Sequence, residues 1–215
     1  MTSTDLDVLD FKEFGKIARL NRDVVITEKI DGTNACIVIK ELIFGVEGFD
    51  EYGQRTLAID DHTGVYEVGA QSRSRALTVE NDNYGFAKWV LKNKEALIEI
   101  LGVGYHYGEW WGSGINRGYG LKNGEKRFSL FNVERWKDQV GFDKVEGLEV
   151  VPVLYQGAFS EEKINDALIS LKRIGSNAVF NFNNPEGIVI WHEHARQLFK
   201  VTIENDDVPK SKVKQ

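Results

Sequence analysis

The hydrophobic positions of this chain fall into short runs, separated by polar segments that contain glycine, aspartate or asparagine. Two runs, at residues 24–27 and 35–39, are rich in β-branched residues, which is typical of buried strands. They flank the segment Glu28-Lys29-Ile30-Asp31-Gly32-Thr33-Asn34, so we predict a hairpin over 24–39 with this segment as its connection. The connection has two interpretations: a β-turn with a solvated lysine, or a lysine held between rigid strands as a nucleophile.

Further apolar runs predict the rest of the sheet structure. The expected strands lie at residues 42–44, 65–70, 105–111, 127–135, 149–155, 187–191 and 198–203. Between two of them, residues 45–64 are rich in glycine and aspartate and are expected to form a surface excursion. Strands and helices do not alternate one for one, which favours an α+β fold with largely antiparallel sheets and flanking helices.

Three segments are predicted to be helical. Residues 11–20 have an apolar face suited to a short helix, and Asn81 or Asp82 can cap a helix that reaches about residue 101. A third helix is expected to begin after Ser160 as its cap and to end at Gly175. Its apolar stripe is spaced to face a sheet.

Composition sets the class of protein. The chain has 215 residues, of which 42% are hydrophobic and 28% charged, so we expect one domain over 1–205 and a lysine-containing tail over 206–215. Cys36 is the only cysteine, which excludes an internal disulfide and favours a reducing compartment. No apolar run is long enough to span a bilayer and no export signal is visible, so a cytoplasmic protein without a membrane partner is expected.

Charge is unevenly distributed along the chain. The formal net charge is −6, and acidic residues predominate over 41–67, whereas basic residues predominate over 111–137. Such a basic stretch can bind phosphates whatever the net charge. Its candidate nucleic-acid-binding residues are Arg117, Lys122, Lys126 and Arg127; the alternative is an ordinary mixed surface.

Four later stretches carry side chains suited to chemistry. Glu109 lies among glycines and aromatics, Phe131 belongs to an aromatic alternation, Glu186 precedes an apolar strand, and Lys200 lies inside one. A lysine or glutamate buried in a strand is uncommon without a partner, so two such strands support grouping these stretches with residues 28–34.

These motifs resemble those of the covalent nucleotidyltransferase superfamily of polynucleotide ligases and capping enzymes. Residues 29–34 match its lysine–x–aspartate–glycine motif, and Arg73, the glycine–glutamate pair at 108–109, the glutamate–glycine pair at 186–187 and Lys200 follow in the same order. Asn34 and the run 108–112 are most similar to RNA ligases of the phage RNA ligase 2 type. The ordered set extends from about residue 28 to 202, which is most of the chain.

The resemblance implies an ATP-dependent RNA ligase reduced to its adenylyltransferase core. Lys29 would form a covalent lysyl-AMP, and AMP would pass to a polynucleotide 5′-phosphate that is then joined to a 3′-hydroxyl. The implied ATP-binding residues are Glu28, Ile30, Asn34, Arg73, Glu109, Phe131, Glu186 and Lys200. Asp31 and Glu186 would hold Mg²⁺ or Mn²⁺, because hard cations prefer oxygen ligands.

The resemblance also sets expectations about partners and size. The substrate would be RNA or nicked nucleic acid, bound by a monomer or with help from a separate nucleic-acid-binding partner. A phage-encoded protein that acts in the host cytoplasm would be consistent with the subtype. Because the chain ends soon after the last motif, no separate oligonucleotide-binding or C-terminal domain is expected.

Several alternatives stay open. A DNA ligase, a capping-type nucleotidyltransferase or a non-catalytic nucleic-acid-binding module would share many of these residues. Asn132 and Thr202 depart from the family pattern, which usually has aspartate and lysine there, so their roles are open. His192 and His194 would suggest zinc only if further ligands joined them.

Overall fold

The computed structural model describes residues 12–42, 57–59, 65–141 and 143–206, which form two β-sheets. Sheet A has the strand order β11-β10-β1-β9, and sheet B has the order β3-β4-β2-β6-β7-β8, with β5 paired to β4. Among the described strands, every pair is antiparallel except β7–β8. The predicted α+β fold with largely antiparallel sheets is therefore confirmed.

The strands have the following bounds. Sheet A consists of β1 (Asp23–Lys29), β9 (Val153–Ala158), β10 (Gly187–His192) and β11 (Gln197–Thr202). Sheet B consists of β2 (Thr33–Leu42), β3 (Leu57–Ile59), β4 (Val65–Ser72), β5 (Ala76–Leu77), β6 (Gly104–Gly112), β7 (Lys126–Leu130) and β8 (Leu148–Val150).

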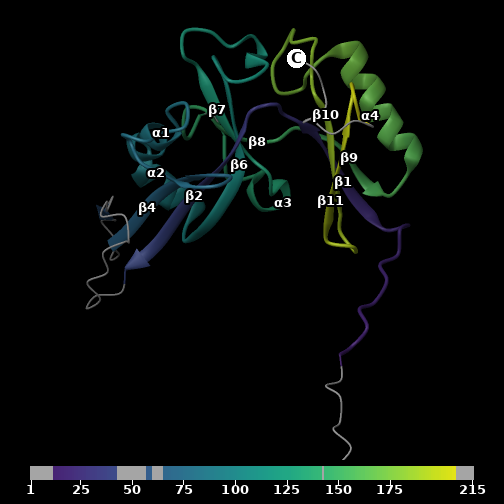
Figure 1. The fold of residues 1–215 in the computed structure, drawn as a ribbon, viewed down its shortest axis with the longest axis horizontal. Helices are drawn as coiled ribbons and strands as arrows, with labels where there is room; N and C mark the ends of the chain where they lie inside the picture. Colours follow the sequence, from purple (N-terminus) through teal and green to yellow (C-terminus); the bar gives the residue numbers. More distant parts are fainter. Residues whose placement is uncertain (1–11, 43–56, 60–64, 142, 207–215) are drawn as a thin grey trace, which may run out of the picture.

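Helices cover the outer side of each sheet (Figure 1). Helix α4 (Glu161–Ile174) packs Ala167 and Leu171 on sheet A, while α1 (Phe86–Lys92) and α2 (Lys94–Leu101) pack on sheet B. A third apolar cluster, formed by Ile30, Trp111, Tyr119, Val133 and Val151, contains residues from both places where the chain passes between the sheets. Burial of apolar surface in these clusters is the main stabilising contribution to the fold.

The predicted hairpin over 24–39 is wrong. Strand β1 pairs with β9 and β10 in sheet A, whereas β2 pairs with β4 and β6 in sheet B. The connection at 30–32 crosses from one sheet to the other, with Ile30 buried in the third cluster. A Cβ on Gly32 would lie 2.5 Å from the carbonyl oxygen of Trp110, so this glycine is required by close packing rather than by a β-turn.

Two other predicted strands are divided. The segment 149–155 forms the end of β8 in sheet B and the start of β9 in sheet A, and it crosses at Pro152, which has no N–H to donate to a ladder. The segment 127–135 forms β7 and then a short helix, α3 (Val133–Trp136), whose backbone N–H at Arg135 donates to the side chain of Asn132. An asparagine in this position favours a helix start over a longer strand.

The predicted helices differ in outcome. Helix α4 begins after Ser160, whose hydroxyl accepts from the N–H of Lys163, and it ends at Gly175, as expected. The expected helix ending at about residue 101 is two helices, because Asn93 interrupts it and donates its side-chain amide to the carbonyl of Trp89. The first of them begins after Gly85 and not after Asn81 or Asp82, although the Asp82 carboxylate accepts from the N–H groups of Ala87 and Lys88 in its first turn.

No helix forms over residues 12–20, so that prediction is wrong for the described part of the segment. Phe14 and Ile17 are exposed and have no surface to pack against, and a helix this short is marginal in water without such packing. The predicted excursion at 45–64 and the tail from 206 lie largely outside the described residues, as do residues 43 and 44 of the strand expected at 42–44. None of the helices in the described ranges has the length and apolar character that a membrane crossing needs.

Candidate active site

Lys29 and Glu186 meet at the end of sheet A that adjoins sheet B. Strand β1 ends at Lys29, which is paired with Gly187 at the start of β10, so the two side chains are brought together by the strand register. The Lys29 Nζ lies 2.5 Å from Oε2 of Glu186, and the two side chains are 19% and 4% exposed. The strand register thus places a lysine against a buried carboxylate, and both residues had been singled out from the sequence.

Asp31 is anchored on three sides. Its backbone N–H donates to the Tyr119 hydroxyl at 2.9 Å, and its Oδ1 accepts from the Asn116 side-chain amide at 3.1 Å. Its Oδ2 accepts from Nε of Arg117 at 3.2 Å. The carboxylate two residues after Lys29 is therefore oriented by the β6–β7 connection. Asn116 and Tyr119 were not singled out from the sequence, where only the surrounding glycines mark the connection as unusual.

Arg117 belongs to the hydrogen-bond network around Asp31 and does not lie on an open basic surface. Besides Asp31, its Nη1 donates to the carbonyl and side-chain oxygens of Asn184 at 3.0 and 2.6 Å, and to the carbonyl of Pro185 at 3.3 Å. Asn184 was also not predicted. The sequence assignment of Arg117 to nucleic-acid binding is therefore not supported by its contacts.

Glu109 lies on β6 next to Asn34 on β2, as the strand register requires. Its Oε1 accepts from the N–H of Gly32 at 3.1 Å, and its Oε2 accepts from the Asn34 amide at 2.8 Å. Burial raises the pKa of the Glu109 carboxyl to about 7, while the charge of Lys29 and the two hydrogen bonds oppose that rise. The side chain therefore titrates near neutral pH.

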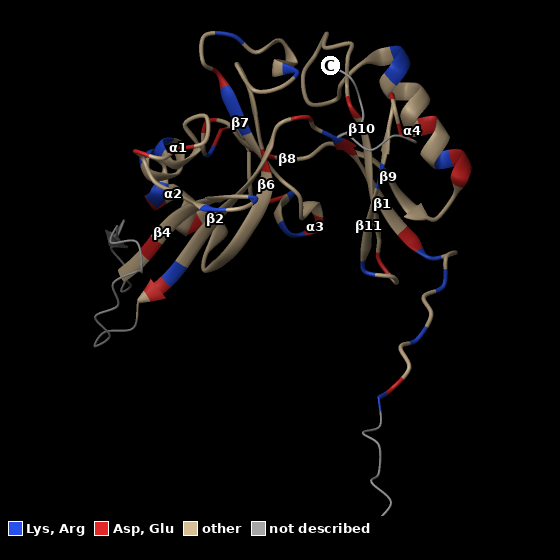
Figure 2. Cartoon of the chain, in the orientation of Figure 1, with Lys and Arg blue, Asp and Glu red and all other residues tan. Residues whose placement is uncertain are grey.

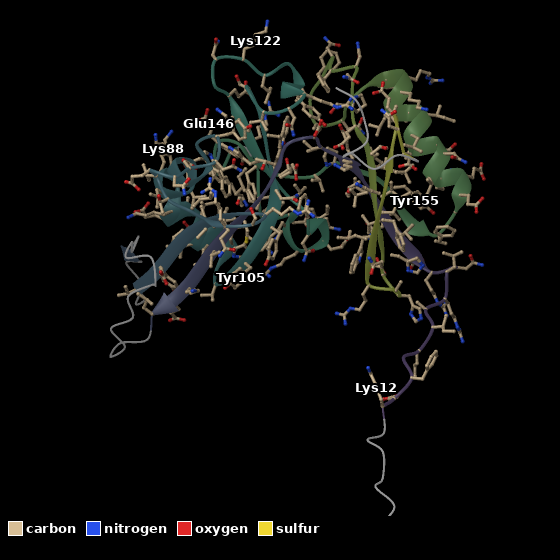
Figure 3. The ribbon with its side chains drawn as sticks, in the orientation of Figure 1. Lys12, Lys88, Tyr105, Lys122, Glu146 and Tyr155 are labelled. Carbon is tan, nitrogen blue, oxygen red and sulfur yellow. The ribbon has the colours of Figure 1, made fainter. Side chains whose placement is uncertain are left out.

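The same face of sheet B carries exposed side chains near Glu109. Arg73 directly follows β4 and is exposed, and the Phe131 N–H donates to the carbonyl of Tyr107 at 3.0 Å beyond the end of β7. Phe131 is 43% exposed, and Tyr105 and Tyr107 are 53% and 59% exposed and stack on each other. Tyr105 can be seen toward the lower end of β6 (Figure 3). Large aromatic side chains that stay in water are available for a ligand.

The Glu28 carboxylate accepts hydrogen bonds from groups of the protein. Its carboxylate accepts from the Ser176 hydroxyl at 2.6 Å and from the N–H groups of Asn177 and Ala178 at 2.7 and 3.2 Å. Burial raises its pKa, and these three hydrogen bonds act in the opposite direction. The structure thus gives Glu28 a role in fixing the 176–178 segment, and its contact with adenine stays a prediction.

Lys200 and the remaining predicted residues have mixed outcomes. Lys200 is paired with Val189 and is exposed, so the expectation of a buried lysine in this strand is wrong. Ile30 is buried in the third cluster, where it supports the crossing from Lys29 to Gly32. The Thr202 N–H donates to Oδ1 of Asp206 at 2.8 Å and so closes the turn after β11.

Outside this region, the histidines have protein partners. The His192 ring contacts the carbonyl of Leu20 through Nε2 and the N–H of Ala195 through Nδ1, at 2.8 and 3.2 Å. His194 follows the end of β10 and is exposed. Across the described ranges, no group of three or more histidine, cysteine, aspartate or glutamate side chains is arranged to hold a metal ion.

Some residues of the basic stretch 111–137 are paired within the protein, and others are exposed to solvent. Arg127 pairs with Glu125 at 2.8 Å and with Glu149 at 3.8 Å, and its guanidinium lies over the ring of Trp111. Lys126 is half-buried and contacts the carbonyl of Gly124, whereas Lys122 is exposed at the outer edge of the β6–β7 connection (Figure 3). Figure 2 shows Lys and Arg positions in blue on β7 and on the connection before it. Of the four predicted nucleic-acid contacts, Lys122 is thus the most accessible.

The sequence profile of the RNA ligase family matches residues 22–202. This range includes Lys29, Asp31, Glu109, Glu186 and Lys200. The chain belongs to the RNA ligase family.

Two solved structures illustrate the likeness in fold. A variant of Naegleria gruberi RNA ligase with ATP and Mn has a TM-score of 0.54 and 19% identity, over 86% of this chain and 51% of that chain. Another variant, with AMP and Mn, has a TM-score of 0.53 and 18% identity, over 85% and 50%. The chain therefore spans about half the length of these proteins. A comparison with curated protein sequences found no match.

Proposed function

We propose that this protein is an ATP-dependent RNA ligase whose nucleophile is Lys29. The observation that carries the proposal is the Lys29–Glu186 pair at the meeting point of the two sheets, in a chain that belongs to the RNA ligase family. Around this pair, Glu109, Asn34 and Arg73 provide polar groups and Phe131 provides an exposed ring.

In the first step, the Lys29 amine attacks the α-phosphorus of ATP. An N–P bond forms, the bond between the α-phosphorus and the bridging oxygen breaks, and pyrophosphate leaves. A lysine side chain is protonated at neutral pH and only its neutral form is nucleophilic, so the proton must leave Nζ before attack. The carboxylate of Glu186 contacts Nζ and is a group that can accept this proton.

The next two steps use the AMP held on Lys29. An oxygen of an RNA 5′-phosphate attacks the AMP phosphorus, the P–N bond breaks, and Lys29 recovers its amine. The 3′-hydroxyl of the second RNA end then attacks the activated 5′-phosphate, a phosphodiester forms, and AMP leaves. The exposed face of sheet B, with Arg73, Asn34 and Phe131, is suited to bind the ribose and base of the nucleotide throughout.

The carboxylates of Asp31 and Glu186 have the ligand chemistry that a divalent cation requires. Glu186 and Asp31 offer the hard oxygen atoms that Mg²⁺ and Mn²⁺ prefer, close to the proposed nucleophile. A cation held there would supply positive charge that offsets the charge on the phosphates. The Naegleria gruberi proteins of similar fold were solved with ATP or AMP and Mn, which supports the choice of nucleotide and metal.

The decisive test is covalent labelling. Incubated with ATP and Mg²⁺, the protein should gain the mass of one AMP, and Lys29→Ala should gain none, because the proposed nucleophile is the amine that contacts Glu186. Lys88→Ala, which removes an exposed lysine of α1, should label like the unchanged protein. A labelled Lys29→Ala protein would remove Lys29 as the nucleophile, and labelling by GTP in preference to ATP would indicate a capping-type enzyme.

A further inference from the structure

We propose that Arg117 is a positioning residue that holds Asp31 and Glu186 in place for the attack by Lys29. The inference rests on the proposed function and adds a residue to it. Arg117 touches two segments that lie far apart in the sequence, the crossing after β1 and the turn before β10. Both segments carry a carboxylate close to the proposed nucleophile.

The turn before β10 depends on these contacts. Residues 182–186 have no regular secondary structure, and Glu186 is the last of them. Two carbonyl oxygens and one side-chain oxygen of Asn184 and Pro185 accept from the guanidinium of Arg117. The other side of Glu186 is fixed by its carbonyl, which accepts from the N–H of Ile203. Arg117 therefore restrains the backbone from which the Glu186 side chain projects.

The loop that carries Arg117 is itself held rigidly. Asn116 and Tyr119 both have left-handed backbone conformations, with φ of 43° and 51°. Conformations of this kind persist only where the surroundings hold them. Tyr119 is buried, its hydroxyl accepts from the N–H of Asp31, and its ring stacks on Phe182 with the centroids 4.4 Å apart. The loop is thus locked to both segments that Arg117 joins.

The geometry also requires arginine in particular. Nε donates to Asp31 while Nη1 donates to Asn184 and Pro185, which uses two separate corners of one planar group. A lysine ammonium is a point charge and cannot reach both partners with the same fixed directions. With its donors directed to these partners, the Arg117 guanidinium is poorly placed to bind an RNA phosphate as well.

The experiment compares Arg117→Ala and Arg117→Lys with Arg173→Ala, which removes an exposed arginine from the last turn of α4. Single-turnover labelling with ATP gives the first-order rate constant and the ATP concentration for half-saturation. We expect Arg117→Ala to lower the rate constant about 10- to 100-fold at unchanged half-saturation, since a small misplacement of reacting groups has effects of this size. Arg117→Lys should recover less than half of that loss on a logarithmic scale, and Arg173→Ala should match the unchanged protein.

A second readout does not depend on activity. Hydrogen exchange of the backbone amides at 182–187 should be faster in Arg117→Ala than in the unchanged protein, with thermal unfolding still cooperative. Asn184→Ala, which removes one acceptor and leaves the arginine in place, should show a smaller effect of the same kind. The effects of Arg117→Ala and Asn184→Ala should not add in the double variant, because the two residues share one interaction.

Three results would overturn the proposal. Wild-type labelling and exchange in Arg117→Ala would show that the contacts position nothing. A defect confined to ATP half-saturation would show that Arg117 binds ATP, and a defect confined to sealing of pre-adenylated RNA would show that it binds RNA. If the unchanged protein takes up no AMP, the proposed function fails, and the exchange measurement still decides whether Arg117 holds the turn.

Discussion

The two sheets present different kinds of side chain where they meet. On sheet A, Lys29 and Glu186 are largely buried and paired with each other. On sheet B, Arg73 and Phe131 are exposed, and among the described residues Arg73 has no partner. Groups that are buried and paired interact strongly through a low dielectric, whereas exposed groups are free to bind a ligand but interact weakly with it. This difference suggests that sheet A governs the rate of the chemistry and sheet B governs the binding of the nucleotide.

The largest effect should follow from a change on sheet A. Glu186→Ala should lower the rate constant of self-adenylylation at least about 100-fold, because a single electrostatic contact can contribute ~3 kcal/mol to a transition state. Lys200→Ala, on the same sheet, should lower the rate constant less, since Lys200 is exposed and its charge is screened by water. Both variants should keep the circular dichroism of the unchanged protein.

The control is Glu161→Ala, which removes an exposed carboxylate from the first turn of α4. It should label at the normal rate. Equal losses in Glu186→Ala and Lys200→Ala would contradict the importance of burial in this comparison, and normal labelling of both would mean that the two residues are structural.

The sequence was more informative about which residues of sheet A are candidates for chemistry than about the strand pairing and packing that position them. The motifs singled out Lys29, Glu186 and Lys200, but the sequence did not predict that β1, β10 and β11 pair in one sheet. The hairpin at 24–39 failed because the sequence of a connection does not tell whether the next strand joins the same sheet. The requirement for Gly32 comes from Trp110, which lies far away in sequence and meets the glycine only in the folded chain.

The same limit applies to the basic residues of the stretch 111–137. Charge density along 111–137 predicted a phosphate-binding surface. In the structure, Arg117 donates to Asp31 and Asn184, and Arg127 pairs with Glu125 and Glu149. Pairing between distant segments cannot be seen from composition. By contrast, the cap at Ser160 was predicted correctly, since a cap acts within a few residues of itself.

Glu109 is buried on β6 of sheet B, and its titration should change the stability of the protein. The folded carboxyl has a pKa raised to about 7 from an ordinary value of 4.5, chiefly by burial. Below pH 4.5 the group is protonated whether the chain is folded or unfolded. Between 4.5 and 7 the unfolded chain loses the proton first, so the free energy of unfolding should fall as the pH rises, by about 2–3 kcal/mol in total.

Glu109→Gln isolates this contribution, because it keeps the shape and cannot titrate. The difference in the free energy of unfolding between the unchanged protein and Glu109→Gln, measured with urea from pH 4 to 8, should fall through this window and level off above about pH 8. Glu99→Gln, on the exposed side of α2, should follow the unchanged protein across the range. A difference that stays constant with pH would show that the Glu109 carboxyl has the same pKa in the folded and the unfolded chain, so that burial does not raise it.

The smallest effect is expected on sheet B, where binding to an exposed group contributes least. Arg73→Ala should raise the ATP concentration for half-saturation about tenfold, which corresponds to about 1.4 kcal/mol, with little change in the rate constant. Arg73 directly follows β4, which pairs with the strand that carries Asn34. Its exposed side chain can contact a ribose hydroxyl or a phosphate. Single-turnover labelling over a range of ATP concentrations separates the two quantities. If Arg73→Ala instead lowered the rate constant at unchanged half-saturation, sheet B would share in the chemistry, and the division between the two sheets would not hold.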